Sequence, residues 1–127
     1  MTKLASVFAV IGLLVATTRT AIAAPVINTP PLPSNIGGAV ALICQALNTG
    51  SKTATVTVEI IEANGGGATL ATNGPSPLSP HTLMNASVIT VTSNTYCRVT
   101  GLTPPKGRVT YFAEGAGGSI LMSVTAP

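Results

Sequence analysis

Few residues of this chain have side chains that could take part in catalysis, and their spacing does not bring them together. His81 is the single histidine, and it follows Ser79 by two residues in a proline-rich segment. A Ser-His pair needs a third group that orients the imidazole, and the sequence contains no Asp. We therefore expect His81 to be an exposed loop residue without a catalytic role.

The carboxylates are scattered in the same way. Glu59 and Glu62 are three residues apart on a predicted strand, so they should point to opposite faces and cannot act as a carboxylate pair. One histidine, two cysteines and three dispersed glutamates do not match the ligand sets of zinc or calcium. The sequence thus predicts a protein that is not an enzyme, with no cofactor and no metal site.

The start of the chain has the layout of a secretory signal peptide. Lys3 gives a short basic region, residues 4–16 form an almost unbroken apolar run, and Ala21 and Ala23 are the small residues of an A-x-A cleavage site. Cleavage one residue later would leave Pro25 at the first mature position, so cleavage after Ala23 is expected. The predicted location is therefore the periplasm or the extracellular space.

Subtracting this segment changes what the composition implies. Removing 23 of 127 residues leaves 104, enough for one domain, with a proline-rich leader at 24–38 and a folded domain at 39–127. Four cations then stand against three carboxylates, a net charge of +1 rather than +3. This charge is too small for counterion-release binding to nucleic acid, and no second apolar run is long enough to cross a membrane.

Export also bears on whether the two cysteines form a disulfide. Cys44 and Cys97 each fall in the middle of an apolar segment, and two cysteines in an exported domain usually form a disulfide. Two buried free thiols, or a redox or metal-binding pair, are the alternatives. We expect the disulfide.

Alternating polar and apolar residues are typical of strands. From residue 53 to residue 60, Thr or Glu alternates with Ala, Val or Ile, a period that fits a half-buried strand and no helix. Organised structure is expected from about Gly38, and residues 73–80 are expected to form a loop because they contain three prolines. Seven strands are predicted, at 39–47, 53–63, 68–72, 82–92, 95–100, 108–114 and 119–125.

This pattern predicts an all-β fold, a single antiparallel β-sandwich of about seven short strands, with a small barrel as the alternative. Three segments, Cys44–Gly50, Val56–Ile60 and Tyr96–Val99, resemble small secreted bacterial proteins of unassigned function with immunoglobulin-like or fibronectin-like sandwiches. The resemblance covers residues 39–125 and implies that architecture. The chain departs from true immunoglobulin domains in having no Trp, and in placing Tyr96 one residue before the cysteine where the tyrosine corner would want two.

The sequence is thus interpreted as an exported, non-enzymatic module with a structural or binding role, whose partner is a protein or glycan of the envelope or beyond it. The alternative is a subunit of a surface fibre or envelope complex that assembles through sheet edges. A third hypothesis is a protease inhibitor of the chagasin type, since 48–50 and 115–118 faintly resemble its loops. The oligomeric state is left open.

Overall fold

The computed structural model describes residues 23–64, 66–89 and 91–127. Its described residues form eight strands: β1 (Val26–Asn28), β2 (Ala39–Asn48), β3 (Ala54–Glu62), β4 (Thr69–Leu78), β5 (Leu83–Val88), β6 (Thr95–Thr100), β7 (Gly107–Gly115) and β8 (Ile120–Thr125). A short 3-10 helix, η1 (Ala116–Gly118), joins β7 to β8. The predicted signal peptide, up to and including Ile22, lies outside the described residues, while the predicted cleavage residue Ala23 is exposed.

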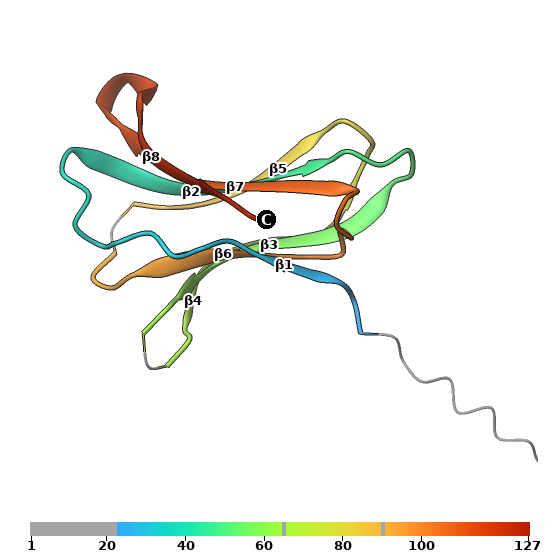
Figure 1. The fold of residues 1–127 in the computed structure, drawn as a ribbon, viewed down its shortest axis with the longest axis horizontal. Helices are drawn as coiled ribbons and strands as arrows, with labels where there is room; N and C mark the ends of the chain where they lie inside the picture. The colour runs from blue at the N-terminus through green and yellow to red at the C-terminus, as the bar shows by residue number, and fades with distance from the viewer. Residues whose placement is uncertain (1–22, 65, 90) are drawn as a thin grey trace, which may run out of the picture.

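The strands form two antiparallel sheets of four strands, in the orders β1-β6-β3-β4 and β5-β2-β7-β8. Figure 1 shows these sheets as two layers, which gives a sandwich-like molecule. Each sheet has two edge strands, so the strands do not close into a small barrel. The all-β antiparallel prediction is therefore confirmed. None of the helices in the described part of the chain is long and apolar enough to cross a bilayer.

The hydrophobic pattern decides which face of each sheet is buried. In β3, Val56, Val58 and Ile60 are fully buried, while the Thr and Glu residues between them are half-buried or exposed. In β2, the alternate residues Leu42 and Cys44 are buried in the same way. Because side chains of a strand point to opposite faces in turn, each sheet presents one apolar face to the other.

The disulfide lies in the shared core. Cys44 of β2 and Cys97 of β6 belong to different sheets, both are fully buried, and they are joined by a disulfide. Their Cα atoms are 5.5 Å apart, which is the usual separation for a disulfide. The bond therefore ties the two layers together at the centre of the molecule, among buried residues of seven strands.

Organised structure begins earlier than Gly38, so that sequence-based prediction was wrong. Residues Val26–Asn28 form β1 and pair with β6, and Leu32 makes an isolated bridge with Thr95 and is almost fully buried. Prolines break up the pattern around this short strand. The nearest prolines, Pro25 and Pro30, lie on either side of β1, so neither of them removes a ladder hydrogen bond within the strand.

Residues 73–78 are a second correction, because they belong to β4 and not to a loop. Pro77 pairs with Thr55 of β3 in spite of its missing N–H group. β4 is the outer strand of its sheet, so a proline nitrogen can face away from the ladder without losing a bond. The register between β3 and β4 shifts next to Val58, which is typical of a bulge that admits irregular residues.

The Gly-rich segment after β7 forms a hairpin connection to β8. Gly117 has φ +80°, in the left-handed region that glycine occupies without strain, and the chain reverses there into β8. In the part of the chain that the structure describes, β8 pairs with β7 alone and is the outermost strand of its sheet.

Candidate functional site

His81 and Ser79 do not form a catalytic arrangement. His81 is exposed, and its backbone N–H donates to the carbonyl oxygen of Asn48 (2.7 Å). The hydroxyl of Thr82 donates to the carbonyl oxygen of Ser79 (2.6 Å). In the described residues no hydrogen bond joins the side chains of Ser79 and His81, and the segment is a tight turn between β4 and β5.

The carboxylates of Glu59 and Glu62 interact with different residues. Arg98 Nε lies 3.0 Å from Glu59 Oε2 across neighbouring strands, and this hydrogen bond raises the pKa of Arg98. Glu62 Oε1 instead accepts a hydrogen bond from the hydroxyl of Ser93 (3.0 Å). Among the described residues, no three His, Cys, Asp or Glu side chains gather closely enough to hold a metal ion.

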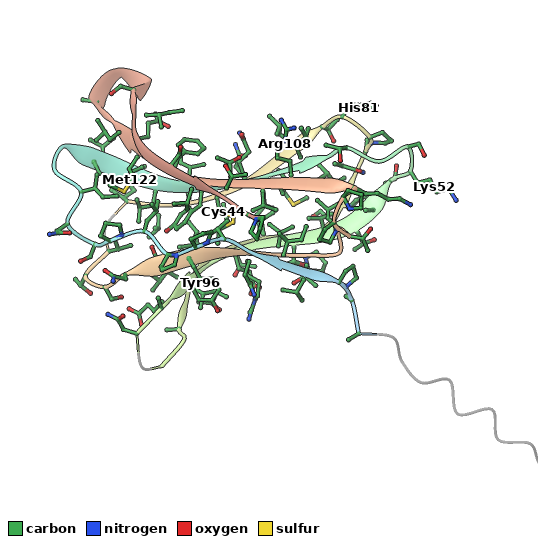
Figure 2. All side chains as sticks on the ribbon, viewed as in Figure 1. Cys44, Lys52, His81, Tyr96, Arg108 and Met122 are labelled. Carbon is green, nitrogen blue, oxygen red and sulfur yellow. A yellow bond between two sulfur atoms is a disulfide. The ribbon has the colours of Figure 1, made fainter. Side chains whose placement is uncertain are left out.

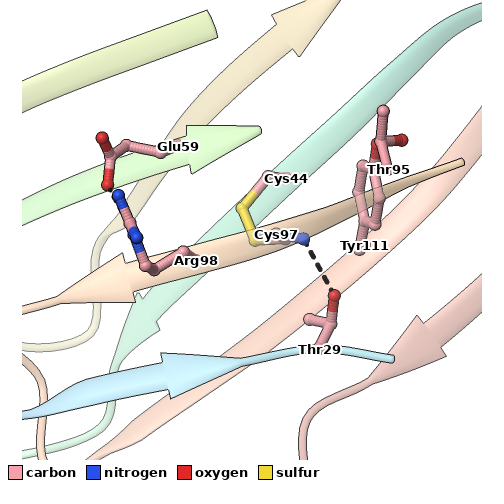
Figure 3. The surroundings of a disulfide bond; sticks show 7 residues. All are labelled: Thr29, Cys44, Glu59, Thr95, Cys97, Arg98 and Tyr111. Carbon is pink, nitrogen blue, oxygen red and sulfur yellow. Dashed lines mark hydrogen bonds and ion pairs between the residues drawn. A yellow bond between two sulfur atoms is a disulfide. The ribbon is translucent and has the colours of Figure 1, made fainter. Parts of the chain in front are cut away.

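The surroundings of the disulfide are polar in two places (Figure 3). The hydroxyl oxygen of Thr29 accepts a hydrogen bond from the backbone N–H of Cys97 (3.0 Å), which fixes the segment after β1 against β6. On the other side of Cys97, the hydroxyl groups of Thr95 and Tyr111 are hydrogen-bonded to one another. Each buried hydroxyl thus has a partner, as buried polar groups require.

Tyr111 is a core residue that the sequence analysis did not single out. It is the largest of the fully buried side chains, and burial raises its pKa to about 12. The alternate positions of Val109, Tyr111 and Ala113 along β7 were a sequence pattern that could have indicated that Tyr111 is buried. In the structure all three side chains are fully or almost fully buried. In the sequence Tyr96 is the more conspicuous tyrosine, because it lies next to a cysteine.

The charged residues are separated along the strands, which could not be seen in the sequence. The turns 49–53, 79–82 and 101–106 lie together at one end of the molecule, as the pairing of Asn48 with Gly107 requires. We call this the basic end, because it holds Lys52, Lys106 and Arg108; Figure 2 shows Lys52 and Arg108 there, with His81.

The opposite end holds the two carboxylates that make no ion pair within the described residues, Glu62 at the end of β3 and Glu114 near the end of β7. We call it the acidic end. Glu59 and Arg98 neutralise one another between the two ends. The described chain is therefore a dipole whose ends carry opposite charge, although its net charge is small.

The basic end is held together by a buried side chain. Asn48 is 2% exposed, its Nδ2 donates to the carbonyl oxygens of Lys52 and Leu78 (both 2.9 Å), and its Oδ1 accepts from the N–H of Gly50 (3.0 Å). Asn48 therefore acts as a structural link. The two segments that suggested a protease inhibitor lie at opposite ends of the molecule, residues 48–50 at the basic end and residues 115–118 at the acidic end.

The most unusual surface of the described chain is the free edge formed by β8. Five of its six residues are exposed, including Ile120 (63%), Leu121 (43%) and Met122 (43%). Because neighbouring residues of a strand point to opposite faces, this run leaves apolar groups uncovered on both faces. The backbone groups on its outer side have no partner strand in the described chain, as at any sheet edge.

The other three edges carry features that hinder strand addition. β1 is three residues long, and β4 contains two prolines. β5 lies against β4 of the other sheet, and the carbonyl oxygen of its Asn85 accepts a hydrogen bond from Asn73 Nδ2 (2.8 Å). Short strands, prolines and covering segments are the usual means of protecting an edge. β8 has none of these features.

Comparisons with protein-family models, with curated proteins and with solved structures found no match for this chain. The candidate site therefore rests on the geometry of the molecule itself.

Proposed function

We propose that this protein is an exported, non-enzymatic module with an immunoglobulin-like sandwich, and that it acts by binding a partner at the edge of a sheet. The observation that carries this proposal is the free, apolar edge of β8. Unpaired backbone groups on such an edge offer hydrogen bonds to an added strand, and the exposed side chains offer apolar contacts. The catalytic residue types, in contrast, lie apart from one another.

The immunoglobulin-like part of the proposal is supported by the central strands. In immunoglobulin domains strand B pairs with E, strand C pairs with F, and a disulfide joins B to F. Here β2 pairs with β5, β3 pairs with β6, and the disulfide joins β2 to β6. The outer strands differ, because β7 pairs with β2 in the sheet opposite to the one that holds β6.

Export is supported by two features of the chain. A buried disulfide between sheets is stable in an oxidising compartment and rare in the cytosol. The proposed cleavage site lies at exposed residues just ahead of β1, so that cleavage after Ala23 would leave every strand intact.

The proposal covers both a single binding module and a subunit of a larger envelope assembly, since the same edge serves either role. A fibre would need a second complementary surface, and the three remaining edges are protected. The geometry therefore favours a module with one principal contact strand.

Export is tested by expressing the full chain in a bacterial host and analysing its cell fractions. We expect a mature chain that begins at Ala24 outside the cytoplasm, with both cysteines resistant to alkylation until reduction. An uncleaved chain in the cytoplasm with two alkylated cysteines would contradict the proposed function.

The contact surface is tested in the same cells with a photo-crosslinking amino acid. Position 122 on β8 should give discrete crosslinked products in the exported fraction. Position 83, which is 54% exposed on β5 at the opposite edge of the same sheet, is the matched control and should give few. Crosslinking at position 83 alone would contradict the assignment of β8.

A further inference from the structure

The composition of the β8 edge narrows the kind of partner it can accept. Residues 116–127 contain no charged side chain, and β8 itself contains no proline. A lysine or an inward-pointing charge is the common device that keeps two sheet edges apart. β8 lacks such a charge, and unlike the other edges it is neither very short, interrupted by proline nor covered by another strand, so it is open to a strand of the same apolar kind.

A second copy of β8 meets this requirement. Two identical strands can pair antiparallel about a two-fold axis, and the pairing is closed and self-complementary because each copy offers the same groups to the other. The two four-stranded sheets would then join into one sheet of eight strands, with β5 of each copy at its outer edges.

The charge separation along the molecule favours the antiparallel direction. β8 runs from the acidic end, where Ile120 pairs with Glu114, towards the basic end, where Thr125 pairs with Thr110. An antiparallel pair places the basic end of each copy beside the acidic end of the other. A parallel pair would place like charges side by side.

From these observations we infer that the protein forms a two-fold homodimer through antiparallel pairing of β8 with β8 of a second copy. The inference rests on the proposed function, since it names the partner of the same edge. Three strand spacings separate β7 from its counterpart across such a pair, about 15 Å. At this distance the charges orient the encounter, whereas the backbone hydrogen bonds and the apolar side chains hold the dimer.

The dimer is expected to be weak. Six residues per copy form less than a standard protein interface, which buries about 1,600 Å² in total. We therefore expect a dissociation constant in the micromolar range or above, with monomer predominating in dilute solution.

The test uses the oxidised mature chain, residues 24–127, and measures its molar mass by light scattering over a range of concentrations. Wild-type protein should shift from monomer towards dimer as its concentration rises. Met122→Lys should raise the dissociation constant by about tenfold or more, because the two lysines then lie close to the two-fold axis and repel one another. Ile120→Lys should also raise it, because it replaces an exposed apolar side chain of the contact edge by a charge. Leu83→Lys, on the opposite edge, is the matched control and should dimerise as wild type does.

Two results would overturn the inference: a wild-type chain that stays monomeric at millimolar concentration, or a Leu83→Lys variant that loses the dimer while Met122→Lys keeps it. Circular dichroism and an intact disulfide verify that each variant is folded. If Met122→Lys does not fold, Ile120→Lys takes its place in the test.

NMR contacts between a labelled and an unlabelled copy test whether the two β8 strands pair antiparallel or parallel. Contacts between residues 120 and 125 support the antiparallel pair, and contacts between residue 120 of both copies contradict it.

These results are separable from those that test the proposed function. An exported, disulfide-bonded chain that crosslinks to a different protein from position 122, yet stays monomeric when pure, refutes the homodimer and leaves the binding module standing. Retention in the cytoplasm refutes the proposed function whatever the molar mass of the purified chain.

Discussion

Tyr111 lies fully buried between the two sheets, and its hydroxyl is bonded to the hydroxyl of Thr95. Tyr111→Phe keeps the ring and leaves Thr95 without its partner in a dry environment. We expect the free energy of unfolding to fall by about 1–3 kcal/mol, measured by chemical denaturation. Tyr96→Phe is the control, because Tyr96 is only half-buried, and it should change stability little. Equal effects of the two substitutions would contradict this role of the Tyr111 hydroxyl.

The same residue predicts how stability changes at high pH. Burial raises the pKa of Tyr111 to about 12, above the value near 10 of an unfolded tyrosine. A group whose pKa is higher in the folded state contributes its stability below the unfolded value and loses it as the pH rises through the folded value. We therefore expect thermal stability to fall between about pH 10 and 12. Tyr111→Phe should remove most of this fall, and an unchanged profile would argue against Tyr111 as its source.

Asn48 offers a further prediction at this scale. Its side chain makes three hydrogen bonds to the backbone of the turns at the basic end. Asn48→Ala leaves these buried groups unpaired, and we expect a loss of about 2–4 kcal/mol in the free energy of unfolding. Asn28→Ala, at an exposed position, is the control. A melting temperature of Asn48→Ala within a degree of wild type would contradict this structural role.

Among the elements, β2 and β6 are joined by the disulfide. The two cysteines are 53 residues apart in sequence, and closing a loop of this length stabilises a protein by about 4 kcal/mol in the chain-entropy model. Cys44→Ala/Cys97→Ala should therefore unfold at a much lower denaturant concentration than the oxidised chain. The reduced wild-type chain should behave like this double variant, and oxidised protein no more stable than reduced protein would contradict this contribution.

The sequence predicted the elements whose signals are local. Alternation of Val and Thr in β3 depends only on neighbouring residues. A strand is present in each of the seven predicted regions, but the prediction of 82–92 was too long, because β5 ends at Val88. β1 and the second half of β4 were missed because proline marks a loop when the sequence is considered alone. Whether a proline is tolerated in a strand depends on its place at an edge, and strand order is a property of the whole fold.

The candidate site was less predictable than the fold. Ile120, Met122 and Val124 alternate as a buried face would, yet only Val124 is partly buried. Whether an apolar face of a strand is covered depends on how far the opposite sheet extends. A local sequence pattern does not predict that extent. The disulfide, in contrast, was predictable, because export and the position of each cysteine in an apolar strand both favoured it.

For the molecule as a whole, the separation of charge between its ends has a measurable consequence. Glu114→Lys replaces a carboxylate of the acidic end by a cation that would face the basic end of a second copy. We expect this variant to weaken the dimer about two- to fivefold at low ionic strength, and 0.5 M salt should abolish the difference because it screens charges at such distances. Glu114→Gln should have about half the effect. Tighter association of Glu114→Lys would contradict the antiparallel arrangement.

Two copies of the protein are proposed to meet at the edge of β8. Amide hydrogen exchange, followed residue by residue at dilute and at millimolar concentration, detects such a contact. We expect the amides of β8 to exchange more slowly at the higher concentration, while those of β5 are unchanged. Exchange of β8 amides that does not depend on concentration, or slowing at β5 in their place, would contradict it.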